Sequence, residues 1–294
     1  MSRQYLWYEE DFTRLYGCVS RTRGHYLYTQ KGKRLTDMYA ESGRALLGWG
    51  NTASPAMTMF KNMVTKGLTG SFPTGAHHRL EKAVRSLLPE VTAVGIYTSI
   101  ASVEKALKEY CGEAAFTQEL LEVSSAEELV QQKRIVRWRP WLGMHKATEG
   151  VALTSDSTVE AYIVVPPLPW ASELYVVGYT CNGTEAQKKK IPADDVLPPA
   201  LVLAAARSFY DLKKNLPLRG EKNWKLFDKV LSLYWQRTGP YLVPKVPKEK
   251  YSGFFLHCLQ RGLFISPYYG EPSFVPYGVT EGDFKLLEKE PFLF

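Results

Sequence analysis

The chain has 294 residues, 45% of them hydrophobic and 13% aromatic, and a formal net charge of +7. This length and apolar content are enough for one large or two modest folded domains, so we expect a globular protein. Because the basic residues alternate with acids over most of the length, the net charge by itself does not indicate a nucleic-acid-binding protein.

The opening of the chain and its cysteines argue against several further classes. The first residues, MSRQYLWYEEDF, carry acids where a signal peptide needs an apolar core, and no later stretch approaches the ~18 apolar residues of a membrane span. The four cysteines lie far apart, without a CxxC pair or a cluster with histidine, which argues against a zinc site and a disulfide framework. We therefore expect a soluble, cytoplasmic protein with free thiols and no bound metal.

The first part of the chain predicts a hairpin and two helices. Residues 25–29 and 34–39 alternate around a turn at 30–33, as in a β-hairpin. The stretch GWGNTASPAM then matches the spacing of a dinucleotide-binding turn, with Gly48, Gly50 and Ala53 in the key positions. Since no acid follows Glu41 until Glu81, nothing is placed to hold a ribose, and we do not expect a dinucleotide. Apolar residues at helical spacing predict helices over 54–66 and 77–88.

Residues 94–110, VGIYTSIASVEKALKEY, read as strand, turn and helix. The hydroxyl residues Thr98, Ser99 and Ser102 lie at the turn, where the free N–H groups of the helix start point at one spot. Such a turn suits an anion such as phosphate. It is also the ordinary form of a helix start capped by Ser99 or Ser102, and the local residues leave both interpretations open.

Residues 133–141, KRIVRWRPW, form the most basic and aromatic patch. Arg137 and Arg139, together with Trp138 or Trp141, would suit a nucleic acid. An edge strand with its cationic side chains turned outward explains the same pattern, and we favour that interpretation. Two apolar runs, 160–165 and 173–179, predict buried strands on either side of a proline-rich turn.

The remaining residues predict mostly helices. Pro198 and Pro199 fit the first turn of a long helix, and Asp194 and Asp195 fit the positive end of that helix. We expect a second helix over 221–235, a proline-rich connector over 240–250, a helix over 251–260, strands over 262–266 and 273–277, and a last helix from Thr280. The order of elements is α/β in the middle of the chain and α+β at both ends.

Several strings in this order resemble the class III aminotransferases, a branch of the pyridoxal-phosphate enzymes that includes glutamate-1-semialdehyde aminomutase. The resemblance runs through most of the chain. It rests on the hairpin string GHYLYTQKGKRLTDMYAESG with Asp37, on LLGWGNTASPAM, where Trp49 replaces the family's histidine, on SFPTGAHHRLEKAVRSLLPEV, on TSIASVEKALK, on PPALVLAAARSFYDL and on LQRGLFISPYYGEPSFVPYGVTEGDF.

The resemblance implies an α/β fold of the fold type I aminotransferase kind. Its central sheet would be reduced, mostly parallel and flanked by helices, and a small α+β domain would be built from both termini. On this basis residues 1–50 contribute to the small domain, residues 51–214 form the large domain, and residues 215–294 complete the small domain. The resemblance also implies a homodimer, since the family's cofactor sites lie at the subunit boundary.

The residues that carry the family's chemistry are altered in this chain. The family's phosphate turn has a glycine where the backbone approaches the cofactor closely, whereas Ile100 and Ala101 follow Ser99 here. Between Ser99 and Tyr179 there is no strand-borne Asp-Glu pair of the kind that holds the pyridine nitrogen in the family. Aligned with the family, Tyr179 stands at the position of the catalytic lysine, and a phenol cannot form the internal aldimine.

We therefore expect a shortened, degenerate aminotransferase-like protein with no catalytic residue and no pyridoxal phosphate. Thr98, Ser99, Ser102 and the Gly43–Arg44 loop would line any remaining pocket, with a small anion as its ligand. One alternative is an active aminotransferase or aminomutase that binds pyridoxal phosphate through a displaced lysine, either Lys146 or one of residues 188–190. The other is an anion-binding or nucleic-acid-binding module that uses residues 133–141. Nucleic acid is the less favoured partner, and we expect no membrane association.

Overall fold

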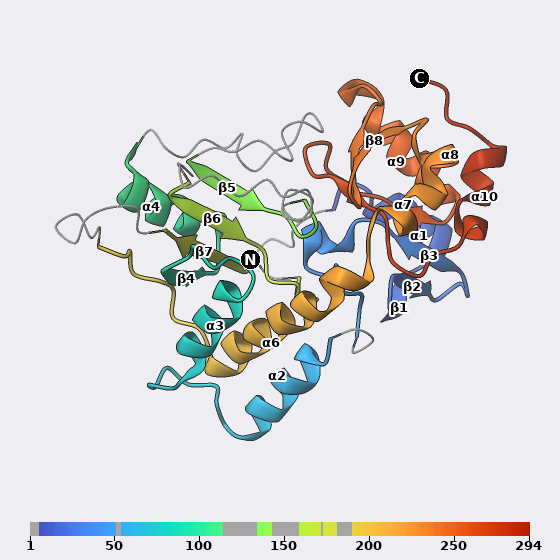
Figure 1. Ribbon diagram of the computed structural model, residues 1–294. Coiled ribbons are helices and arrows are strands. Elements are labelled where there is room, and N and C mark those ends of the chain that lie inside the picture. The colour runs from blue at the N-terminus through green and yellow to red at the C-terminus, as the bar shows by residue number, and fades with distance from the viewer. Residues whose placement is uncertain (1–5, 51–53, 114–133, 143–158, 172, 181–189) are drawn as a thin grey trace.

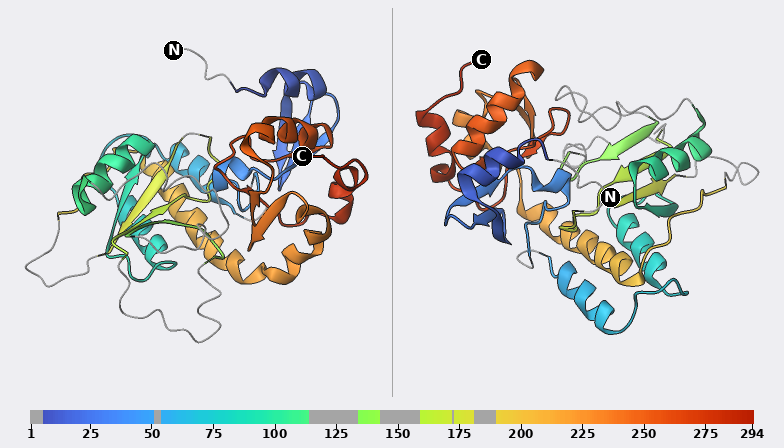
Figure 2. Two further views of the ribbon diagram at one scale, coloured as in Figure 1. Left: turned by 90° about the horizontal axis from the view of Figure 1, so that it is seen from above. Right: turned by 180° about the vertical axis from the view of Figure 1, so that it is seen from behind.

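The computed structural model describes residues 6–50, 54–113, 134–142, 159–171, 173–180 and 190–294. One lobe consists of a four-stranded sheet with its helices, and a second lobe brings the two ends of the chain together (Figure 1). The long helix α6 (Pro199–Asn215) packs against the first lobe and leads into the second, as two further views also show (Figure 2).

The sheet of the first lobe is mixed. Its strands are β4 (Ala93–Tyr97), β5 (Ile135–Trp138), β6 (Ala161–Val164) and β7 (Tyr175–Tyr179), in the order β4–β7–β6–β5. β5 and β6 are parallel, but β7 is antiparallel to both β6 and β4. The expectation of a mostly parallel sheet is therefore wrong for the described strands. Residues 165–174 between β6 and β7 are too few for a crossover helix, so β7 has to run back beside β6.

Helices cover both faces of this sheet (Figure 1). On one face α4 (Ile100–Cys111) packs on Tyr97, Val177 and Tyr179. On the other face α2 (Ala56–Thr65), α3 (Ala76–Arg85) and α6 share a core with Val94 and Ile96. The residues of β4 alternate between the two cores because successive side chains of a strand point in opposite directions. The α/β class expected from the sequence is thereby confirmed.

The second lobe joins the N-terminal strands to the C-terminal segments. Its elements are α1 (Glu9–Tyr16), β1 (Val19–Arg23), β2 (Tyr26–Thr29), β3 (Arg34–Asp37), α9 (Tyr251–Gln260), β10 (Leu263–Phe264) and α10 (Glu281–Lys289). β2 and β3 form the expected hairpin, and β10 pairs in parallel with β3. The hydroxyl of Tyr16 donates to the carbonyl of Leu259 at 2.6 Å. The two ends of the chain thus share one core.

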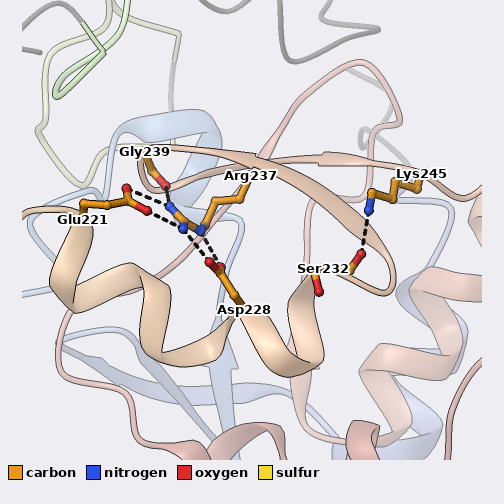
Figure 3. A network of polar contacts seen from close by, with 6 residues as sticks. All are labelled: Glu221, Asp228, Ser232, Arg237, Gly239 and Lys245. Carbon is orange, nitrogen blue, oxygen red and sulfur yellow. Dashed lines mark hydrogen bonds and ion pairs between the residues drawn. The ribbon is translucent and has the colours of Figure 1, made fainter.

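Residues 221–244 differ from the sequence expectation. The expected helix over 221–235 is broken into α7 (Glu221–Trp224) and α8 (Asp228–Leu231), and the expected connector contains β9 (Tyr241–Pro244). β9 pairs with β8 (Trp235–Thr238) and β11 (Ser273–Phe274). The guanidinium of Arg237 on β8 bonds the carboxylates of Glu221 and Asp228, which holds α7 and α8 against the β8–β9 hairpin (Figure 3).

Two buried tyrosines meet over a glycine of β4. The hydroxyls of Tyr97 and Tyr179 lie 2.6 Å apart. A Cβ at Gly95 would come within 2.5 Å of the Tyr97 hydroxyl and 2.9 Å of its ring. The absence of a side chain at Gly95 therefore lets the Tyr97 ring lie back along the strand and reach Tyr179.

We predict that Gly95→Ala lowers the free energy of unfolding by about 1–3 kcal/mol, because the added methyl group displaces a packed ring. Urea unfolding measures the change. Gly253→Ala is the matched control, since Gly253 is helical and a Cβ there meets only Phe292 at 3.9 Å. The control should be neutral or stabilising. Equal stability of Gly95→Ala and the unmodified protein would contradict the packing described here.

Candidate functional site

The turn between β4 and α4 is a regular helix start. Ser99 has an extended backbone with φ −152°, and its side-chain oxygen accepts from the N–H of Ser102 at 3.0 Å. Ser99 is therefore the N-cap of α4, and Ser102 is the residue whose N–H it satisfies. Of the two capping residues that the sequence left open, the structure selects Ser99.

Carboxylates from two other segments occupy further donors of this turn. Asp195 Oδ2 accepts from the N–H of Thr98 at 2.8 Å and from its hydroxyl at 2.7 Å. Glu173 Oε2 accepts from the N–H of Ile100 at 2.9 Å. These are donors of the kind that would hold a phosphate at a helix N-terminus. In this chain the anions bound there are its own side chains.

Asp195 reaches the turn because the segment before α6 runs along the edge of the sheet. Among the described strands β4 is an edge strand, and the N–H of Asp195 donates to the carbonyl of Ile96 at 2.9 Å. The neighbouring Asp194 bonds His77 of α3 at 3.2 Å instead. Both acids therefore serve partners other than the start of α6, which corrects the expectation from the sequence. These pairings are not visible in the sequence, because the partners lie far apart along the chain.

The hydrogen bonds at the turn affect titration. Burial raises the pKa of Asp195, but the N–H and hydroxyl of Thr98 and the hydroxyl of Ser102 outweigh it and hold the pKa below its ordinary value of 3.8. The hydrogen bond that His77 donates to the Asp194 carboxylate raises the pKa of His77 above its ordinary value of 6.5, although partial burial opposes it. Asp195 is thus a carboxylate at neutral pH, and the turn faces a negative charge.

The Gly43–Arg44 loop lies at the same end of the sheet as the turn. Tyr175 pairs with Tyr97, the residue before Thr98, and the Arg44 guanidinium lies 5.2 Å from the centre of the Tyr175 ring. The structure therefore brings the loop and the turn to one end of the sheet, although no direct bond joins them among the described contacts.

A strained backbone leads into this loop. Ala40, Glu41 and Ser42 have φ of 48°, 48° and 53°, a left-handed conformation that costs roughly 1–2 kcal/mol for each non-glycine residue. The buried carboxylate of Asp37 holds the segment, since it accepts from the N–H of Ala40 at 2.9 Å. It also accepts from the indole N–H of Trp49 at 2.7 Å. The pair that the resemblance singled out, Asp37 and Trp49, thus shapes the backbone that presents Arg44.

Tyr179 does not belong to this end of the sheet. It pairs with Ala93 at the start of β4, whereas the turn follows Tyr97, so about 13 Å of strand separates them at ~3.3 Å per residue. Its side chain is buried in the core beneath α4, and burial raises the pKa of its hydroxyl. Tyr179 is a packing residue in this arrangement.

The described strands of the sheet carry neither lysine nor a carboxylate residue. Lys190 lies exposed at the beginning of the segment that leads to α6. Lys146, Lys188 and Lys189 lie outside the described residues, as do the acids Glu127 and Glu128. The turn therefore has no amine partner among the strand residues that the structure describes.

The basic patch of β5 turns inward. Arg137, whose side chain is 9% exposed, bonds both carboxylate oxygens of Glu271 at 2.7 and 3.1 Å. Arg139 lies over the ring of Tyr241 at 5.6 Å, and Trp141 is buried. β5 is an edge strand among the described strands, as expected, but the outward direction expected for its cations is wrong for Arg137. Glu271 and Tyr241 of the second lobe supply the reason.

Comparisons with other proteins bear on the fold. No protein-family model matches the chain. It is 28% identical to an uncharacterized protein of Treponema pallidum (strain Nichols), with 92% of each chain covered. It is 24% identical to an uncharacterized protein of Borreliella burgdorferi, with 92% of this chain and 88% of that protein covered.

Solved aminotransferase structures superpose on most of the chain. Acetylornithine aminotransferase from Elizabethkingia anophelis gives a TM-score of 0.62 at 16% identity, over 96% of this chain and 97% of that one. Ornithine aminotransferase from Plasmodium yoelii gives 0.59 at 12% identity, over 92% and 91%. The chain therefore has the fold of the pyridoxal-phosphate fold type I aminotransferases. No described helix is both long and apolar enough to cross a bilayer.

We predict that Asp195→Asn lowers the free energy of unfolding at neutral pH by about 0.5–1 kcal/mol, as for a carboxylate lost from a helix N-terminus. Because folding depresses the pKa of Asp195, its contribution is present above the ordinary value of 3.8 and is lost as the pH falls through the folded-state pKa. Urea unfolding between neutral and acidic pH should show the two proteins converging.

Asp194→Asn is the matched control, with the opposite trend. Because folding raises the pKa of His77, the pairing of His77 with Asp194 contributes below 6.5 and is lost as the pH rises through the folded-state pKa. A deficit of Asp195→Asn that persists in acid, or one that matches Asp194→Asn at every pH, would contradict the assignment of Asp195 to the turn.

Proposed function

We propose that this protein is a non-catalytic member of the aminotransferase fold that no longer holds pyridoxal phosphate at the α4 turn. The observation that carries the proposal is the occupation of the Thr98 and Ile100 donors by Asp195 and Glu173. A cofactor phosphate would have to replace both carboxylates or sit beside them. The residues present therefore do not fit the phosphate group.

Simple electrostatics supports this proposal. Two unit charges 4 Å apart repel by about 4 kcal/mol at an effective dielectric constant of about 20. The attraction of a helix N-terminus for an anion contributes only about 0.3–1 kcal/mol near a surface. Repulsion by Asp195 and Glu173 therefore outweighs the attraction of the α4 N-terminus, unless both carboxylates leave their own hydrogen bonds.

Other residues point the same way. Ile100 adds a β-branched side chain where the family has glycine. Tyr179, which we align with the family's lysine, cannot form an aldimine. The aminotransferase resemblance also leads us to propose a homodimer.

A direct test is to mix the protein with pyridoxal phosphate, reduce it with borohydride and map the modified peptides by mass spectrometry. We predict only scattered, substoichiometric labelling of surface lysines, and no half-reaction with amino donors. Stoichiometric labelling of one lysine, together with a half-reaction that its substitution abolishes, would overturn the proposal in favour of an active enzyme with a displaced lysine.

A gain-of-binding experiment tests the role of the two carboxylates. We predict that the double variant Asp195→Ala and Glu173→Ala binds inorganic phosphate at least tenfold more tightly than the unmodified protein, because the N–H groups of Thr98 and Ile100 become free. Calorimetric titration measures the change. Asp194→Ala is the control, since Asp194 is adjacent but bonds His77. No gain in the double variant, or an equal gain in the control, would show that the carboxylates do not exclude phosphate.

A further inference from the structure

Unsatisfied polar atoms gather at the junction of the two lobes. Among the described residues seven buried side-chain nitrogen or oxygen atoms have no hydrogen-bond partner, and five of them belong to His25, Arg44, Arg219 and Tyr241. Arg44 is 7% exposed and Arg219 is 6% exposed. Since buried polar groups are nearly always paired, a concentration of exceptions in one place calls for an explanation.

One loop carries Arg44 and accepts a hydrogen bond from the second buried arginine, Arg219. Arg219 Nη1 donates to the carbonyl of Leu46 at 3.0 Å, two residues beyond Arg44. The Arg219 guanidinium also lies 4.5 Å from the ring centre of Tyr277 and 5.8 Å from that of Trp141. Its Nε has no partner, nor do Nε and Nη2 of Arg44.

Phe274 of β11 connects this loop to the remaining members. Its ring lies about 6 Å from the rings of His25, Trp141 and Tyr241. Arg139 covers the ring of Tyr241. We call Arg44, Arg137, Arg139, Arg219, His25 and Tyr241 the junction cluster.

The junction cluster carries more positive than negative charge. The carboxylate of Glu271 binds Arg137 and that of Glu41 lies near Arg44, so two carboxylates stand against four arginines. Burial lowers the pKa of Arg139 and of Arg219 to about 10, so both stay charged at neutral pH. Burial and the charge of Arg219 lower the pKa of His25 to about 3, so it is neutral there. The excess is therefore cationic at neutral pH.

We propose that the junction cluster binds a small dianion whose charges are carboxylate or phosphate groups. Unpaired Nε–H and Nη–H groups of arginine match such oxygens in a two-point arrangement, and the hydroxyl of Tyr241 adds a donor. Tyr277, which is 48% exposed, packs against the Arg219 guanidinium, so only one side chain separates this arginine from the surface. The proposal does not depend on loss of the cofactor, because it uses none of the donors at the α4 turn.

Thermal unfolding and calorimetric titration with succinate, citrate and inorganic phosphate test the proposal, with potassium chloride at equal ionic strength as the salt control. We expect at least one of these anions to raise the melting temperature and to bind measurably. Arg44→Met and Arg219→Met should each weaken binding at least tenfold. Arg23→Met, at an exposed arginine of β1, should leave it unchanged. The carboxylates and phosphate, tested separately, identify the preferred group.

The folding of the variants gives an independent readout. Without an anion, Arg44→Met should melt no lower than the unmodified protein, because it removes a buried guanidinium whose Nε and Nη2 have no hydrogen-bond partner. Arg44→Lys keeps the charge without the fork of donors and should bind with intermediate affinity. The proposal is overturned if no anion exceeds the chloride control, or if Arg23→Met weakens binding as much as Arg44→Met and Arg219→Met do.

Discussion

The hydrogen bonds from Thr98 to the Asp195 carboxylate decide what the turn between β4 and α4 can bind. They join the segment before α6 to the end of β4, beside a backbone bond from Asp195 to Ile96. The backbone of Asp195 thereby covers part of an edge strand, and its carboxylate satisfies the residue before the N-cap of α4. Glu173, in the segment before β7, accepts from the N–H of Ile100, the first residue of α4. The donors of Thr98 and Ile100 at this turn are thus satisfied from within the chain.

The α4 turn and the junction cluster differ in charge. At the α4 turn the chain supplies its own anions, whereas at Arg44 and Arg219 three guanidinium nitrogens have no hydrogen-bond partner. Tyr175 links the two places, since it pairs with the strand that leads to the turn and stacks beneath Arg44. We therefore propose that a ligand with negative charge is repelled at the turn and attracted at the junction cluster.

Local patterns in the sequence predicted local structure well. The strand, turn and helix around Thr98, the hairpin before Asp37 and the proline start of α6 all follow from residues within one or two turns of each other. Contacts between distant residues were not predictable. Asp195 lies 97 positions from Thr98, and Glu271 lies 134 positions from Arg137, which explains the errors over the acids before α6 and the direction of the basic patch. The antiparallel direction of β7 was not predicted, although the short connection between β6 and β7 that requires it is visible in the sequence.

The most direct measurement is a crystal structure of the protein grown with pyridoxal phosphate and inorganic phosphate in excess. We predict that Asp195 still accepts from the N–H and hydroxyl of Thr98 and that Glu173 still accepts from the N–H of Ile100. No electron density for a phosphate group should lie at the α4 turn. A phosphate group bound to these N–H groups, with the two carboxylates displaced, would contradict this prediction.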